Sequence, residues 1–221
     1  NKPNFCLFHQ TQKEEKEISK NILIIGTPRC GKSTISNQLF QRNKNYELLR
    51  GDIFSLALGI LYRRKKISQM KPKNGILKLD TKEINLPNEV ITEVFYEMLD
   101  QMEIDLKKAN RKMIFETHEI SIENAKKQFE PLGFDIYCMG MPNENVDNLM
   151  KQIRKNDDDN DWTRKIGSVR LELICNYIIN YSKENEEECK KYNVDFFDTS
   201  GNREEKIEEI IKTIEEKSIN N

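Results

Sequence analysis

The chain has 221 residues, of which 33% are charged and 37% hydrophobic, and its formal net charge at pH 7 is −1. This length suits a single α/β domain with a substantial core. The near-neutral charge creates no overall field that would attract nucleic acid or an anionic membrane, and the apolar runs are too short to span a bilayer. We therefore expect neither nucleic acid nor a membrane as a partner, and any phosphate group must be bound by a local site.

The cysteines and the N-terminal segment favour a cytoplasmic location. The five cysteines are odd in number and include no C-x-x-C pair, which is typical of a protein in a reducing compartment. Residues 1–20 lack the long apolar segment of a secretory signal. We predict that they form a loose arm in front of a single domain over residues 21–217.

Strands and helices alternate along the rest of the chain. Short apolar runs predict five strands, at 21–25, 46–49, 112–115, 134–139 and 194–197. Apolar residues at helical spacing predict helices at 32–42, 53–66, 89–109, 121–130, 144–155, 163–190 and 202–217. Residues 67–88 contain proline and glycine and predict loops, with a short hairpin over 76–84. The alternation predicts a parallel sheet covered by helices on both faces.

A phosphate-binding motif follows the first predicted strand. Residues 26–34 read GTPRCGKST, fit the pattern G-x-x-x-x-G-K-[ST] and lead into the first predicted helix. The glycines let backbone N–H groups approach a phosphate, Lys32 can reach the β- and γ-phosphates, and the Ser33 hydroxyl can bind Mg²⁺. We predict nucleotide contacts from the whole motif, which comprises Gly26, Thr27, Pro28, Arg29, Cys30, Gly31, Lys32, Ser33 and Thr34.

Acidic side chains follow three of the predicted strands, at Asp52, Glu116 and Asp198. Ligands of an open parallel sheet bind beyond the carboxyl ends of its strands. We predict that Glu116 supports the Mg²⁺ shell, with a carboxylate near a helix start as the alternative. Asp52 can orient or deprotonate the hydroxyl of an acceptor, or it can cap the helix that begins at residue 53. His118 can contact the acceptor or make a structural hydrogen bond.

Arginines flank the acidic segment 156–161. Phosphoryl transfer places negative charge on the transferred phosphate, and an arginine carried in by a closing segment can stabilise that charge. We predict this role for Arg154 or Arg164, with Arg170 as a further candidate and solvated surface arginines as the alternative. The acidic segment lacks the glycine and the final glutamate of a calcium loop. The only tryptophan of the chain, Trp162, is a candidate apolar anchor for this segment.

With these motifs the sequence resembles the P-loop kinase group that includes nucleoside monophosphate kinases, shikimate and gluconate kinases, and chloramphenicol phosphotransferase. The resemblance is carried by residues 26–34, by RGD at 50–52, by IFE at 114–116 and by FFDTSG at 196–201. It implies a P-loop NTPase fold of three α/β/α layers, with a five-stranded parallel sheet in the order 2-3-1-4-5. It also implies a substrate segment at about 53–88, a lid at about 143–170, and adenine contacts from Ser200, Gly201 and Arg203.

The motif and the resemblance together predict an ATP- and Mg²⁺-dependent phosphotransferase acting on a small hydroxylated or nucleotide-like acceptor. The chain has glutamate at 116 where many members have aspartate, and it lacks both a D-G-[FY]-P-R motif and a dense R-x-x-x-R set. These departures favour a hydroxylated or nucleoside-like acceptor over a nucleoside monophosphate.

Other classes of nucleotide-binding protein are alternatives to the predicted phosphotransferase. A P-loop ATPase that acts as a nucleotide-operated switch, or that binds a protein partner, is the alternative function. A GTPase is disfavoured because the chain lacks N-K-x-D, and Lys32 favours a triphosphate over the phosphosulfate of a sulfotransferase. The sequence makes no prediction about the oligomeric state.

Overall fold

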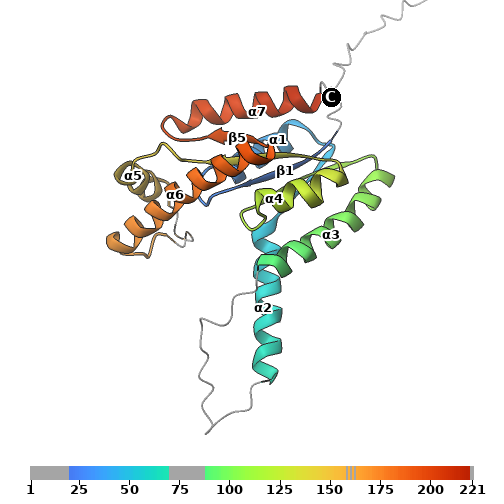
Figure 1. Cartoon of the computed structure of the whole chain (residues 1–221), viewed down its shortest axis with the longest axis horizontal. Helices are drawn as coiled ribbons and strands as arrows, with labels where there is room; N and C mark the ends of the chain where they lie inside the picture. Colours follow the sequence, from blue (N-terminus) through green and yellow to red (C-terminus); the bar gives the residue numbers. More distant parts are fainter. Residues whose placement is uncertain (1–19, 70–87, 158, 160, 162, 220–221) are drawn as a thin grey trace, which may run out of the picture.

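The centre of the molecule is a parallel sheet of five strands (Figure 1). The computed structural model describes residues 20–69, 88–157, 159, 161 and 163–219. The strands are β1 (Asn21–Gly26), β2 (Tyr46–Arg50), β3 (Lys112–Thr117), β4 (Phe134–Gly140) and β5 (Asp195–Asp198). They lie in the order β2-β3-β1-β4-β5, and every neighbouring pair is parallel. This arrangement confirms the predicted sheet and its strand order.

Helices cover both faces of the sheet. On one face lie α1 (Lys32–Arg42) and α7 (Arg203–Ile219), and on the other lie α3 (Asn88–Lys108) and the short α4 (Ile122–Asn124) (Figure 1). The long α6 (Ser168–Tyr192) contributes to both layers, and α5 (Val146–Asn156) packs beside it. The result is the predicted three-layer α/β/α architecture.

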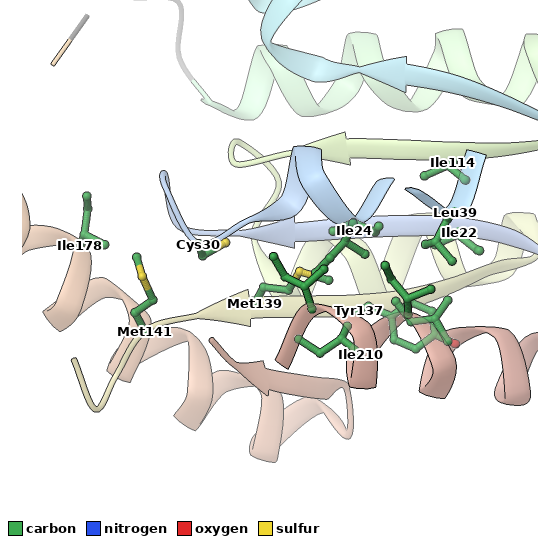
Figure 2. Close-up of a cluster of buried hydrophobic side chains, with 14 of the residues drawn as sticks. Ile22, Ile24, Cys30, Leu39, Ile114, Tyr137, Met139, Met141, Ile178 and Ile210 are labelled. Carbon is green, nitrogen blue, oxygen red and sulfur yellow. The ribbon is translucent and has the colours of Figure 1, made fainter. Parts of the chain in front are cut away.

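The central strand explains how the two cores form. β1 is buried over its whole length, as expected for a parallel strand covered on both faces. Because side chains alternate along a strand, Ile22 and Ile24 enter the core beneath α1 and α7, which Figure 2 shows. Leu23 and Ile25 enter the opposite core beneath α3. The strand is therefore held from both sides and fixes the loop that follows it.

The predicted helices match the observed ones to within two residues at most ends, with larger differences in the helices predicted at 53–66, 121–130 and 163–190. The helix α2 (Gly51–Gln69) begins two residues earlier than predicted, because Gly51 can pack closely against Thr117 where a Cβ would lie 2.6 Å from that side chain. The helix predicted at 121–130 is divided into α4, a π-helical turn over Ala125–Phe129 and a 3₁₀ turn over Glu130–Leu132, where Pro131 and the left-handed Gly133 interrupt regular α-helix. The helix predicted from residue 163 begins at Ser168.

Several sequence predictions concern residues outside the described part of the chain. These are the N-terminal arm up to residue 19, the hairpin at 76–84 and Trp162. Within the described residues, none of the helices has both the length and the apolar character needed to cross a membrane.

Candidate active site

The phosphate loop, which joins β1 to α1, contains two glycines with positive φ angles. Gly26 has φ 142°, and a Cβ at this position would lie 2.1 Å from the carbonyl oxygen of Met139 in β4. Gly31 has φ 103° and is the N-cap of α1, where no side chain makes a capping hydrogen bond. The first N–H groups of a helix have no partner within the helix, so this uncapped terminus can bind an anion.

The side chains of the loop divide into buried anchors and exposed polar groups. Thr27 and Cys30 are fully buried, and the Thr27 hydroxyl lies 3.2 Å from the Ser182 hydroxyl of α6. The Lys32 ammonium donates hydrogen bonds to the carbonyl oxygens of Gly26 at 3.0 Å and Thr27 at 2.8 Å. The Lys32 side chain therefore folds back onto the backbone of its own loop.

One cavity brings together predicted site residues from the phosphate loop, α2 and β3. It has a volume of about 440 Å³ and lies at the carboxyl edge of the sheet. Its lining comes from the phosphate loop, the start of α2, the end of β3 with the residue that follows it, and the segment after α5. The lining residues are Pro28, Arg29, Lys32, Ser33, Asp52, Glu116, Thr117, His118 and Asp161.

A larger cavity of about 560 Å³ lies at the opposite edge of the sheet, next to Lys20, Phe134 and Asp195. None of the residues that line it belongs to the predicted site. Size alone would favour this cavity. The smaller one is the better candidate because ligands of parallel sheets bind at the carboxyl edge, where the phosphate loop lies.

Glu116 is buried at the floor of the smaller cavity, with 5% of its surface exposed. The Ser36 hydroxyl donates to one carboxylate oxygen at 2.8 Å, and Arg50 Nε lies 3.4 Å from the other. Its cavity neighbour Ser33 offers a second hard oxygen atom, so the two residues fit Mg²⁺. Among the described residues, no three or more His, Cys, Asp or Glu side chains form a cluster that could hold a metal ion.

Asp52 forms a pair with His118 at the same edge. His118 Nδ1 donates to Asp52 Oδ1 at 3.0 Å, and 75% of the Asp52 side chain is exposed. This hydrogen bond, helped by the charges of Lys32 and Arg50, holds the pKa of the Asp52 carboxyl below its usual value, although partial burial opposes the shift. Because α2 begins at Gly51, Asp52 lies in its first turn, and the prediction that it caps a helix starting at residue 53 is wrong.

The predicted lid arginines bind their own segment. Arg154 donates to the carbonyl oxygens of Thr163, Arg164 and Ile166. Arg164 donates to the carbonyl oxygen of Asp157 and pairs with Asp159, and Arg170 is exposed at the start of α6. None of the three lines the cavity beside the phosphate loop.

The arginine that does line the cavity is Arg29 of the phosphate loop. Its Nη2 atom lies 3.0 Å from Asp157 and 2.9 Å from Asp161, and it also donates to the Thr163 hydroxyl. The sequence placed Arg29 in the phosphate loop without indicating these partners. The acidic composition of residues 156–161 is the signal in the sequence, but it does not indicate which cation these carboxylates bind.

The loop after β5 lies on the other side of the phosphate loop. The Arg203 guanidinium packs against Gly31, where a Cβ would lie 3.3 Å from its Nε and Nη2 atoms, and burial lowers the pKa of Arg203. The Ser200 N–H donates to Asp198, and the Gly201 N–H donates to Glu144. Of the three residues predicted near adenine, Ser200 and Gly201 thus lie in the loop after β5 and Arg203 begins α7 beside the phosphate loop, but none of them lines the cavity.

No protein-family model matches the chain, and no curated protein matches it. Among solved structures the chain is similar to a gluconokinase from Sinorhizobium meliloti 1021, with a TM-score of 0.54 and 12% identity over 92% of this chain and 96% of the gluconokinase. A tunicamycin resistance protein from Deinococcus radiodurans has a TM-score of 0.48 and 15% identity, over 90% of this chain and 95% of that protein.

A dephospho-CoA kinase from Campylobacter jejuni has a TM-score of 0.47 and 18% identity, over 90% of this chain and 96% of the kinase. The likeness to the gluconokinase, together with the strand order of the sheet, shows that the chain has the P-loop kinase fold. At such low identity this likeness establishes the fold alone.

Proposed function

We propose that the protein is an ATP-dependent phosphotransferase that moves the γ-phosphate to a small hydroxylated or nucleotide-like acceptor. One observation carries the proposal. Lys32 with Ser33, Asp52 and Glu116 come from three separate segments of the chain, yet all line one cavity at the carboxyl edge of the sheet. Lys32 supplies a cation for the phosphates, and Ser33 supplies a hydroxyl for the metal. Of the two carboxylates, Glu116 serves the metal and Asp52 the acceptor.

Each of these residues has a defined task in the proposed reaction. The uncapped N-terminus of α1 binds phosphate oxygens, and Lys32 leaves the carbonyl oxygens of its loop to neutralise their charge. Ser33 and Glu116 would hold Mg²⁺, which neutralises charge on the β- and γ-phosphates. Ser36 fixes the Glu116 carboxylate through its hydrogen bond. Arg203 lies where it can contact the nucleotide beyond Gly31.

The pair of Asp52 and His118 favours phosphoryl transfer over simple ATP hydrolysis. The Asp52 carboxylate, whose pKa is lowered chiefly by the hydrogen bond from His118, is ionised and can accept a hydrogen bond from an acceptor hydroxyl, which orients or deprotonates it. His118 holds one carboxylate oxygen, which orients the group toward the cavity that both side chains line. A substrate segment at 53–88 and a lid at 143–170 remain part of the proposal.

The proposal extends to the compartment. All four cysteines of the described residues, at 30, 138, 175 and 189, are buried and free. Free buried thiols support the predicted reducing cytoplasm.

The test is a screen of nucleosides, sugars, aminoglycosides and other hydroxylated compounds for acceptor-dependent ADP release. A true acceptor should gain the mass of one phosphoryl group, and Lys32→Ala should abolish both ATP binding and product formation while the protein stays folded. Rapid ATP hydrolysis that needs no acceptor and is stimulated by a protein partner would contradict the proposal and favour the switch.

A further inference from the structure

Arg29 connects the phosphate loop to the segment that follows α5. Its Nη2 atom lies 3.0 Å from Asp157 Oδ1 and 2.9 Å from Asp161 Oδ1. The Thr163 hydroxyl accepts from the same nitrogen and donates to Asp157 Oδ1 at 2.5 Å. One guanidinium therefore gathers two carboxylates and a hydroxyl from a segment more than 120 residues away in sequence.

Burial makes this cluster energetically significant. The Asp157 side chain is 1% exposed and that of Arg29 is 19% exposed. A buried carboxylate is strongly unfavourable without a counter-charge, and the other nearby cation, Arg154 Nη1, is 3.8 Å from Asp157 Oδ2. The Asp161 side chain, 28% exposed, lines the cavity together with Arg29 and Lys32. Asp157 thus needs the arginine, whereas Asp161 lies where it can exchange this contact for water.

The backbone conformation of Arg29 also links the phosphate loop to the segment after α5. Arg29 has φ 65°, a left-handed conformation that is uncommon for residues other than glycine, asparagine and aspartate. Such a conformation persists where the surrounding contacts fix it, and here the side chain is held by the segment after α5. The shape of the phosphate loop and the position of that segment are therefore linked.

We propose that Arg29 is a positioning residue that couples nucleotide binding to the position of the segment after α5. The bound nucleotide and the Asp161 carboxylate would compete for the Arg29 guanidinium. With the loop empty, Arg29 neutralises both Asp157 and Asp161. A bound polyphosphate competes with Asp161 for the same guanidinium, so the contact to Asp161 is exchanged while the buried Asp157 stays paired. This proposal rests on the proposed function, because it requires a polyphosphate in the loop, and it adds a means by which the segment responds to it.

The test measures ATP affinity by calorimetry for wild-type protein and Asp161→Asn. Asparagine keeps the shape but removes the competing charge, so ATP should bind about three- to ten-fold more tightly. Adenosine, which lacks phosphates, should bind equally to both proteins. The matched control is Asp159→Asn, because Asp159 belongs to the same segment but pairs with Arg164 and is 91% exposed. It should leave ATP affinity unchanged.

A double-mutant cycle assigns the effect to Arg29. In an Arg29→Gln background the gain from Asp161→Asn should disappear, and Arg29→Lys serves the same purpose if the glutamine variant does not fold. An equal gain in both backgrounds would mean plain repulsion between Asp161 and ATP and would overturn the proposal. An unchanged or weaker affinity in Asp161→Asn would also overturn it. If the wild-type protein binds no ATP, the proposed function is overturned as well. If it binds ATP but Asp161→Asn brings no gain in affinity, only the role proposed for Arg29 is overturned.

Discussion

Asp52 is the residue for which the proposed mechanism makes the most specific prediction. Its carboxylate lines the cavity beside Lys32 and is held by His118. We predict that Asp52→Asn lowers acceptor-dependent turnover by roughly 10²–10⁴-fold, because an amide can neither accept the hydroxyl proton nor orient the acceptor as a carboxylate does. Affinity for ATP, measured in the absence of acceptor, should change little. The two measurements together separate a role toward the acceptor from one toward the nucleotide.

Stability provides the control for this substitution. Because the Asp52 side chain is 75% exposed, its loss should leave the melting temperature nearly unchanged. A variant that melts well below the wild type but turns over normally would show a structural role and contradict the assignment. Equal turnover with equal stability would also remove Asp52 from the mechanism.

Tyr46 at the start of β2 predicts a dependence of stability on pH. Its side chain is 1% exposed, its hydroxyl donates to the carbonyl oxygen of Lys20 at 2.9 Å, and burial raises the pKa of Tyr46 well above its ordinary value of 10.0. The folded state therefore favours the neutral phenol. Its contribution is complete below the pKa of the unfolded chain and is lost as the pH rises above about 10.

The measurement compares denaturant unfolding of the wild type and Tyr46→Phe between pH 7 and pH 11. At pH 7 the variant should be less stable by about 0.5–1.5 kcal/mol, the worth of the lost hydrogen bond. This difference should shrink or reverse above pH 10, because phenylalanine cannot ionise. A constant difference over the whole range would show that ionisation of Tyr46 is not coupled to folding.

At the scale of elements, the contact between the end of β4 and α6 holds the phosphate loop in place. A Cβ on Gly140 would lie 2.9 Å from the Cβ of Ser182 and 3.0 Å from a ring carbon of Phe196. The Ser182 hydroxyl also accepts the N–H of Met141 and lies 3.2 Å from the Thr27 hydroxyl. We predict that Gly140→Ala destabilises the protein by about 1–3 kcal/mol through overpacking and weakens ATP binding, as measured by urea unfolding and calorimetry.

The matched control lies in α2. Gly59 is in the middle of this helix, and a Cβ there would have no neighbour within 4 Å. Gly59→Ala should therefore stabilise the protein by about 0.5–1 kcal/mol, because alanine loses less backbone entropy in a helix than glycine does. Destabilisation by both substitutions to a similar extent would contradict the packing argument at Gly140.

For the molecule as a whole, the sequence was sufficient to predict the sheet but not the ends of all helices. Strand positions follow from apolar runs such as 21–25, which need no tertiary information because both faces are buried. The early start of α2 accompanies the close approach of Gly51 to Thr117, a contact between distant segments that leaves no periodic signal. The break after α4 is local, since a 3₁₀ turn that contains Pro131 ends at the left-handed Gly133, but helical periodicity does not reveal the π-helical turn before it.

The site was predictable only where a motif or a strand end marks it. Lys32 and Ser33 belong to a pattern with a known geometry, and Glu116 lies at the carboxyl end of the buried strand β3, so they line one cavity as expected. The partners of Arg29 could not be predicted, since ion pairs between loops depend on how the chain folds back. For the same reason Arg154, predicted to act on phosphate, binds the carbonyl oxygens of a turn in this structure.

The dispersal of the site over the chain predicts that nucleotide stabilises the whole molecule. The cavity lining comes from residues between 28 and 161, so global unfolding destroys it and ATP binds the folded state alone. With Mg²⁺-ATP at about 100 times its dissociation constant, stability should rise by about 2.7 kcal/mol. The melting temperature should then rise by about 5–10 °C for a domain of this size. Lys32→Ala should lose this shift while melting near the wild-type temperature without nucleotide. A shift of equal size in both proteins, or one produced equally by adenosine, would place the nucleotide elsewhere and contradict the assignment of the phosphate loop.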